Sequence, residues 1–149
     1  MQPDIQNSYE KIAELPAQVK ALCENLKVRI GPQADLAKML DLCTDIHMKV
    51  AGMAPDQILA VARAYRVLLA IVACVDEVEV KAPLERIATS ILEPATPMHS
   101  AGKDAVFELE LLQYIKHRGL DARLGEPDVV VELPRHGTYF VACKRPSIR

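Results

Sequence analysis

Aromatic residues are scarce in this chain, and tryptophan is absent. Aromatic side chains make up 4% of the 149 residues, and glycine occurs only 6 times. Half of the residues are nevertheless hydrophobic, which is enough for a packed core in one compact domain or two small subdomains. The formal net charge of −2 argues against a globally basic nucleic-acid binder. Contacts with nucleic-acid phosphates would therefore need a local basic surface.

The sequence also lacks a disulfide framework and a long apolar run. All four cysteines lie inside apolar helix or strand patterns: Cys23, Cys43, Cys74 and Cys143. We interpret them as packing residues of a reduced, cytoplasmic protein. Cys43 and His47 are four residues apart, which suggests zinc, but no second pair of ligands accompanies them. The polar N-terminus shows no signal peptide, and Val67–Val75 is too short to span a bilayer, so no membrane partner is expected.

Residues 1–93 predict a helical region. Apolar side chains recur there at helical spacing in four stripes. These stripes are Val19, Leu22, Cys23, Leu26 and Ile30; Leu36, Met39, Leu40, Cys43, Ile46 and Val50; Ile58, Val61, Tyr65, Leu68, Leu69 and Val72; and Leu84, Ile87, Ala88 and Ile91. Pro16 is expected to interrupt the first helix, and Val67–Val75, apolar nearly all round, predicts a buried third helix. This region could position DNA, bind a protein partner or form a dimer, and the sequence does not choose.

A linker is expected at residues 94–103, where PATPMHSAGK combines two prolines with small residues and a glycine. It would separate the helical region from an α+β unit of residues 104–149. That unit is predicted to contain a helix over Ala101–Arg118, a short strand at Asp121–Leu124 and a hairpin within Gly125–Pro146. The predicted fold class is therefore α+β.

Glu108 occupies an unusual position on the predicted helix. At about 100° per residue, it falls between Leu111 and Leu112, inside the apolar arc, whereas Glu110 falls on the more polar side. A carboxylate on a core-facing arc costs several kcal/mol unless it has a partner, a proton or a metal. Glu108 is thus either a helix-edge side chain that reaches water or part of a site.

The predicted hairpin carries charged residues on its two strands. Strand alternation puts Asp128, Val130 and Glu132 on one face of the first strand. In the second strand, Ala142 and Lys144 share one face with Phe140. A hairpin of this kind can bring Asp128 and Lys144 together at the ends of adjacent strands.

The segments FELELLQYIKHRG, EPDVVVE and YFVACKRP resemble the PD-(D/E)xK nuclease superfamily, which has the restriction-endonuclease-like fold. The resemblance covers roughly the last fifty residues. It implies a metal-dependent phosphodiester hydrolase acting on nucleic acid, with DNA favoured over RNA as the substrate. Glu108 would be the helix acid, Pro127-Asp128 the PD pair and Lys144 the catalytic lysine.

The same resemblance implies a Mg²⁺ or Mn²⁺ ion held by Asp128 and Glu108, because hard oxygen ligands suit these cations. Lys144 would orient or deprotonate the attacking water, or hold the phosphate. Basic side chains would contact the nucleic acid, namely Arg145, Arg135 and Arg123.

One position departs from the superfamily pattern. The acid two residues before Lys144 is replaced by Ala142, which cannot bind a cation. Three explanations stay open: natural loss of activity, migration of the acid to Glu126 or Glu132, or an engineered knock-out. Metal binding is expected to be weak and cleavage impaired or absent. The alternative function is a non-catalytic nuclease fold or a helical protein-interaction module.

The end of the sequence is the second departure. The nuclease fold normally continues with a helix and further strands, whereas this sequence stops at Arg149. We therefore expect a minimal or truncated fold, or one completed by a partner. An apolar strand face of Tyr139, Val141 and Cys143 would then be exposed, which predicts a two-fold homodimer. The alternative is that the helical half covers the sheet within one chain.

Overall fold

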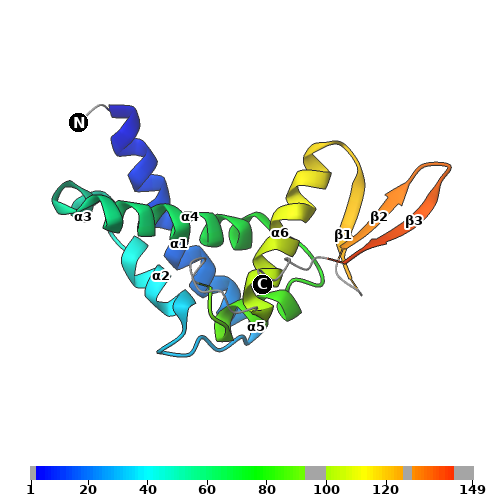
Figure 1. The fold of residues 1–149 in the computed structure, drawn as a ribbon, viewed down its shortest axis with the longest axis horizontal. Helices are drawn as coiled ribbons and strands as arrows, with labels where there is room; N and C mark the ends of the chain where they lie inside the picture. The colour runs from blue at the N-terminus through cyan, green and yellow to red at the C-terminus, as the bar shows by residue number, and fades with distance from the viewer. Residues whose placement is uncertain (1–2, 93–99, 126–128, 143–149) are drawn as a thin grey trace, which may run out of the picture.

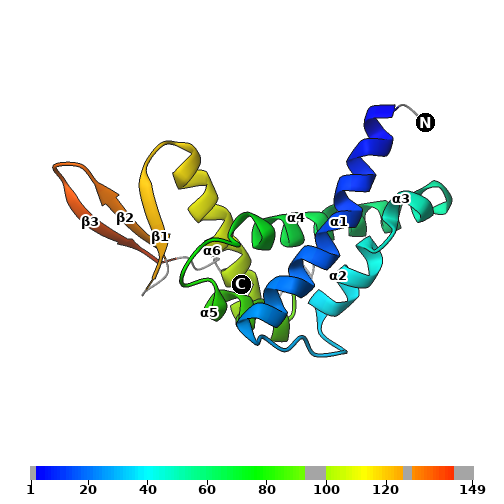
Figure 2. The same ribbon diagram turned by 180° about the vertical axis from the view of Figure 1, so that it is seen from behind.

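The fold combines a group of helices with a small antiparallel sheet, which confirms the α+β class. A computed structural model describes residues 3–92, 100–125 and 129–142. The elements are α1 (Pro3–Leu26), α2 (Asp35–Cys43), α3 (Ile46–Lys49), the 3-10 helix η1 (Val50–Gly52), α4 (Pro55–Ala73), α5 (Lys81–Thr89), α6 (Ala101–His117), β1 (Asp121–Leu124), β2 (Val129–Leu133) and β3 (Gly137–Val141). The helices gather on one side, and the strands extend beyond α6 on the other (Figures 1 and 2).

The first helix is longer than its sequence predicts. Pro16 lies inside α1, which continues without interruption from Pro3 to Leu26. Proline removes one backbone donor, but burial of the neighbouring apolar face holds the helix together across it. Leu15 and Val19, on either side of Pro16, are 7% and 0% exposed. The expected interruption at Pro16 is therefore wrong.

The second apolar stripe belongs to two helices rather than one. α2 ends at Cys43, where Thr44 Oγ1 donates to the Leu40 carbonyl at 2.7 Å. Asp45 then adopts a left-handed conformation with φ 54°, which aspartate tolerates better than most residues. Ile46 is fully buried at the start of α3, so the apolar spacing continues across the break. Cys43 and His47 consequently lie on different helices, and the described residues include no group of three or more His, Cys, Asp or Glu side chains that could hold a metal.

α4 packs against α1, α2 and α6 but is not buried on every side. Val67, Leu68 and Ile71 are buried, but Leu69 is 42% exposed and Val75, beyond its end, is 50% exposed. The prediction of a central, buried helix is therefore confirmed for the face that packs against α1, α2 and α6, whereas the opposite face is exposed. α5 begins two residues before the predicted Pro83 and ends at Thr89, so Ile91 lies outside it and is 43% exposed. No described helix is both long enough and apolar enough to cross a membrane.

A single large hydrophobic cluster runs through the described chain. It takes buried residues from α1, α2, α4, α5, α6, β1 and β2. Leu84 and Ile87 of α5 and Leu109 and Leu112 of α6 are 0% exposed within it. The last residues of the expected linker, 101–103, form the first turn of α6. The helical residues and the sheet thus share one core.

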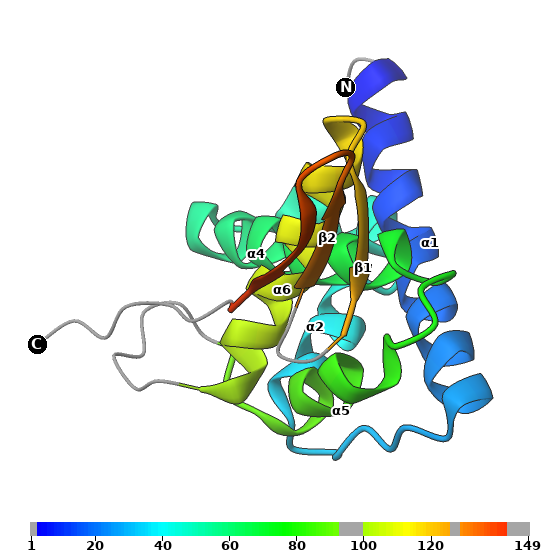
Figure 3. The same ribbon diagram turned by 90° about the vertical axis from the view of Figure 1, so that its right-hand side faces the viewer.

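The three strands form an antiparallel meander in the order β1-β2-β3. This confirms the predicted strand Asp121–Leu124 and the predicted hairpin. On one face, four apolar residues belong to the hydrophobic cluster: Ala122, Leu124, Val129 and Val131. On the other face, Arg123 pairs with Val130 and Val130 with Phe140. Figure 3 looks at the molecule from the side of the sheet, with the strands in front of α6.

Candidate functional site

The close approach of α5 to α6 is the first element of the site. Gly102, in the first turn of α6, has no side chain to separate the two helices. A Cβ at this position would lie 2.5 Å from Ser90 Cβ and 3.1 Å from the Arg86 carbonyl oxygen. Ser100 caps α6 by accepting from the Lys103 amide at 3.0 Å, and its hydroxyl donates to the Ile91 carbonyl. These contacts fix the start of α6 against the end of α5.

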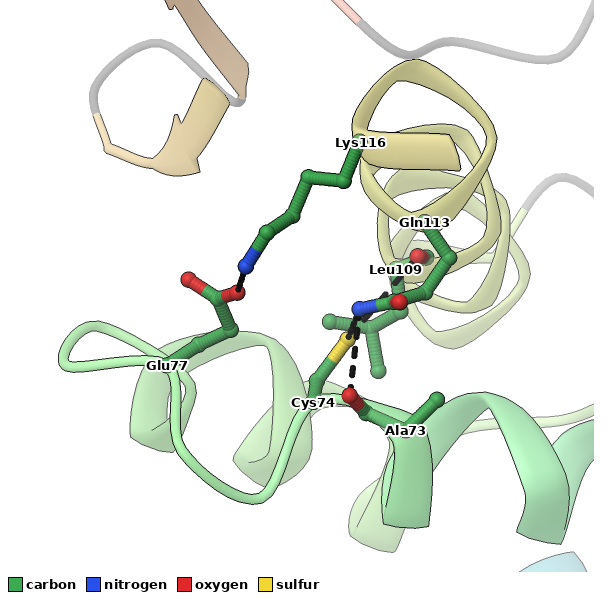
Figure 4. A network of polar contacts seen from close by, with 6 residues as sticks. All are labelled: Ala73, Cys74, Glu77, Leu109, Gln113 and Lys116. Carbon is green, nitrogen blue, oxygen red and sulfur yellow. Dashed lines mark hydrogen bonds and ion pairs between the residues drawn. The ribbon is translucent and has the colours of Figure 1, made fainter. Parts of the chain in front are cut away.

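A polar network holds the middle of α6 against the end of α4 (Figure 4). Gln113 Nε2 donates to the Ala73 carbonyl at 3.1 Å and to Cys74 Sγ at 3.4 Å. Cys74 Sγ in turn donates to the Leu109 carbonyl at 3.8 Å. Burial raises the pKa of the Cys74 thiol, which keeps it protonated and able to donate. An ion pair between Lys116 and Glu77 extends the network. α6 is therefore positioned at two separate points.

Glu108 is buried between these two points. Its side chain is 3% exposed, and its Oε2 accepts a hydrogen bond from Arg86 Nη2 at 2.9 Å. The reading in which Glu108 reaches water is therefore wrong, and the prediction that it needs a partner is confirmed. A charge-assisted bond of this kind offsets part of the desolvation cost of a buried carboxylate. The Arg86 side chain is 35% exposed, so the pair lies at the boundary between core and solvent.

A pocket of about 460 Å³ adjoins this ion pair, and we call it the Glu108 pocket. Side chains of α5, α6 and all three strands line it. Its lining residues are Glu79, Ala82, Pro83, Arg86, Glu108, Arg123, Leu124, Gly125, Val130 and Phe140. The charged groups are two glutamates and two arginines, and the sheet contributes three apolar side chains, Leu124, Val130 and Phe140, beside Arg123. A pocket with an apolar wall and a few convergent charges is typical of a ligand site.

Of the residues predicted from sequence, Glu108 and Arg123 meet in this pocket. Glu132 lies elsewhere on β2, where it accepts from Thr138 Oγ1 at 2.7 Å and from Arg123 Nη1 at 3.2 Å. These two hydrogen bonds lower the pKa of Glu132. Glu132 does not line the Glu108 pocket, so nothing in this geometry favours it as a replacement acid.

Arg135 is separated from the pocket by the length of the hairpin. It lies in the turn between β2 and β3, where it is exposed and has a left-handed φ of 69°. Ala142 follows β3 directly and is exposed. The other predicted site residues lie outside the described residues, namely Glu126, Asp128, Lys144 and Arg145.

The described part of the pocket does not by itself form a cation site. Its two carboxylates are Glu79 and Glu108, and Glu108 already accepts a hydrogen bond from Arg86. Mg²⁺ is usually bound through one or two carboxylates together with water and phosphate oxygens. The resemblance assigns the further ligand of such a cation to Asp128, which lies outside the described residues.

Sequence reasoning missed Arg86. It precedes Glu108 by 22 residues and belongs to the predicted helical region, so no motif connects the two. The available signal was indirect, because a buried carboxylate requires a partner and the partner is often a cation. No protein-family profile matches this chain, and no curated protein or solved structure matches it significantly.

Proposed function

We propose that this protein is a metal-dependent phosphodiester hydrolase of the PD-(D/E)xK type that acts on nucleic acid. The observation that carries the proposal is the buried carboxylate of Glu108 at a pocket lined by all three strands that follow α6. The resemblance implies this same order, a helix with a glutamate followed by strands bearing the Pro-Asp pair and the lysine. The antiparallel meander β1-β2-β3 supports that arrangement.

The site residues would divide the chemistry as follows. Glu108 and Asp128 would hold a Mg²⁺ or Mn²⁺ ion, which supplies charge stabilisation at the scissile phosphate. Arg86 holds the Glu108 carboxylate, and Lys144 would orient the attacking water. Strand alternation predicts that Asp128 shares the face of Val130, and Val130 lines the Glu108 pocket. The placement of Asp128 and Lys144 stays a prediction.

Ala142 limits the activity expected of this chain. It directly follows β3 on the strand that the resemblance assigns to the second acid, and its methyl group supplies no ligand. We therefore expect weak cation affinity and slow cleavage. The alternative, a nuclease fold that binds without cutting, is favoured by the ion pair with Arg86, because Glu108 then has a positive partner without a cation.

The decisive experiment restores the missing acid. Ala142→Glu should raise Mn²⁺ affinity at least about tenfold in titration calorimetry, since even groups that only support metal ligands contribute roughly 10–100-fold. The same variant should cleave labelled DNA or RNA faster in Mg²⁺ or Mn²⁺. Equal affinity and equal cleavage before and after the change would refute the missing-acid explanation. Repeating both assays in a Glu126→Gln/Glu132→Gln background removes the two candidate replacement acids.

A matched pair of variants tests the role of Glu108. Glu108→Gln, made in the Ala142→Glu background, should abolish the gain in metal affinity while keeping an oxygen that can accept from Arg86. Glu110→Gln is the control, because Glu110 lies on the same helix but does not line the Glu108 pocket. Its Oε2 lies 2.6 Å from Arg66 Nε. Equal effects of the two substitutions would show that Glu108 has no special role.

A further inference from the structure

A second hollow lies beside α5 and shares a wall with the Glu108 pocket. It has a volume of about 580 Å³, and we call it the α1–α5 hollow. Its lining residues are Lys27, Val28, Arg29, Ala82, Glu85, Arg86 and Thr89. Ala82 and Arg86 line both spaces. A ligand that crosses α5 at Arg86 can therefore enter both.

Positive charge is concentrated in the α1–α5 hollow. Its lining includes three cations, Lys27, Arg29 and Arg86, of which Arg86 already pairs with Glu108 outside the hollow. The acidic lining residue is Glu85, whose carboxylate lies 3.9 Å from Lys81 Nζ, so the excess charge comes from Lys27 and Arg29. Lys27 and Arg29 are exposed and form no ion pair with any described residue. This local excess occurs in a chain whose formal net charge is −2. Such an excess favours an anionic ligand.

Lys27 occupies a backbone position that normally favours glycine. It follows α1 with φ 58°, its amide donates to the Glu24 carbonyl at 3.2 Å, and the Val28 amide donates to the Cys23 carbonyl at 2.8 Å. This is the Schellman ending of a helix. α6 ends in the same way, but there Gly119 occupies the left-handed position with φ 78°. Strain of this kind at a charged, exposed residue is a reason to look for a function.

The Glu108 pocket adds an aromatic surface to these charges. Phe140 lines this pocket and is 61% exposed. Arg123, which also lines the pocket, is exposed as well. Aromatic side chains interleaved with basic ones are typical of proteins that bind single-stranded nucleic acid, because unpaired bases stack on the aromatic ring. A duplex has no unpaired base to offer.

We propose that a single nucleic-acid strand crosses α5, with phosphates at Lys27, Arg29 and Arg86 and an unpaired base against Phe140. Arg86 has five N–H donors, and the Glu108 carboxylate, which accepts from one of them, fixes the orientation of the guanidinium. The inference rests on the proposed function, since it names single-stranded nucleic acid as the substrate of the same pocket. It also gives the end of α1 a role in holding that substrate.

The test is fluorescence anisotropy of a short labelled oligothymidylate with the full chain in EDTA, at a series of salt concentrations. Lys27→Gly and Arg29→Ala should each reduce the slope of log affinity against log salt by about 0.7, the value for one lost phosphate contact on a single strand. Lys11→Ala is the matched control. Lys11 is exposed on α1, about 24 Å from Lys27 along the helix axis at 1.5 Å of rise per residue. Its replacement by alanine should therefore leave the slope unchanged.

Two further variants and one competitor complete the test. Lys27→Gly should raise the Tm, because glycine relieves the left-handed strain, so weaker binding by this variant cannot be attributed to unfolding. Phe140→Leu should weaken binding of the single strand about five- to hundredfold. Equal salt slopes for Lys27→Gly, Arg29→Ala and Lys11→Ala would overturn the proposed path of the strand across α5. Tighter binding of a duplex than of the single strand would overturn the substrate class.

These outcomes distinguish the proposed strand path across α5 from the proposed hydrolase activity. Binding in EDTA requires neither a cation nor cleavage. Loss of binding in the Lys27 and Arg29 variants without cleavage by any variant supports the path and contradicts the hydrolase. Cleavage by the Ala142→Glu chain with unchanged binding in those variants contradicts the path and supports the hydrolase.

Discussion

Replacing Gly102 by alanine should destabilise the protein where α5 meets α6. The added Cβ would lie 2.5 Å from Ser90 Cβ, well short of the 3.4 Å at which ordinary contact begins. It would also lie 2.9 Å from Leu92 Cδ2 and 3.1 Å from the Arg86 carbonyl oxygen. The leucine methyl can rotate away. Ser90 Cβ and the carbonyl oxygen cannot, because the backbone fixes both, so α6 must move away from α5.

The net effect is a balance of two terms. Overpacking of this kind costs about 1–3 kcal/mol. Replacing a helical glycine by alanine returns about 0.5–1 kcal/mol through conformational entropy. We therefore expect a loss of roughly 1–2 kcal/mol in the free energy of unfolding, which lowers the Tm by about 2–8 °C. A shift of α6 also stretches the ion pair between Arg86 and Glu108.

Urea unfolding followed by far-ultraviolet circular dichroism measures the change. Gly52→Ala is the control, because a Cβ there meets no atom within 4 Å and the change should stay within about 0.5 kcal/mol. Adding Ser90→Gly to Gly102→Ala removes the closest contact and should recover about 0.5 kcal/mol or more as coupling energy. If Gly102→Ala proves as mild as Gly52→Ala, the close packing inferred at this junction is refuted.

Three further predictions concern the core and the surface. Burial raises the pKa of the Cys43 thiol from 9.0 to about 11, so between these pH values the folded chain retains a proton that the unfolded chain loses. Stability should therefore fall as the pH rises from about 9 towards 11, and Cys43→Ala should flatten that fall in urea titrations. Leu109→Ala should cost about 2–5 kcal/mol because Leu109 is 0% exposed, whereas Val78→Ala at a 92% exposed position should be neutral in the same assay. Glu110→Gln, which breaks an exposed pair with Arg66, should cost less than about 1 kcal/mol, and added salt should reduce the effect.

Local patterns predicted the elements around the site well. The apolar arc of the helix placed Glu108 on the core-facing side, because side chains i, i+3 and i+4 share a helix face whatever the rest of the chain does, but it left open whether the carboxylate reaches water. A short strand was also expected at Asp121–Leu124, and the structure confirms it as β1, where Ala122 and Leu124 alternate with exposed residues. Both are consequences of periodicity within a few residues.

Other features depend on contacts that periodicity does not contain. The pairing of Arg86 with Glu108 joins two helices separated along the chain, and the tertiary packing of those helices, which Gly102 allows to be close, brings the two residues together. The break at Asp45 keeps the helical spacing of buried residues on both sides, so the pattern could not reveal it. The predicted helix interruption at Pro16 was wrong because tertiary burial outweighs the local helix-breaking tendency of proline.

The continuity of the hydrophobic cluster has a consequence for how the chain acquires its structure. The three strands pair only with their neighbours in sequence, so the meander closes short loops and can form rapidly. Its buried face, however, includes Val129 and Val131, which belong to the same cluster as Leu15 and Val19 of α1. A hairpin or meander of this size gains little stability without such a surface to pack against. The strands should therefore be stable only while they are packed on the helices, and they should lose hydrogen-exchange protection together with α6 rather than before it.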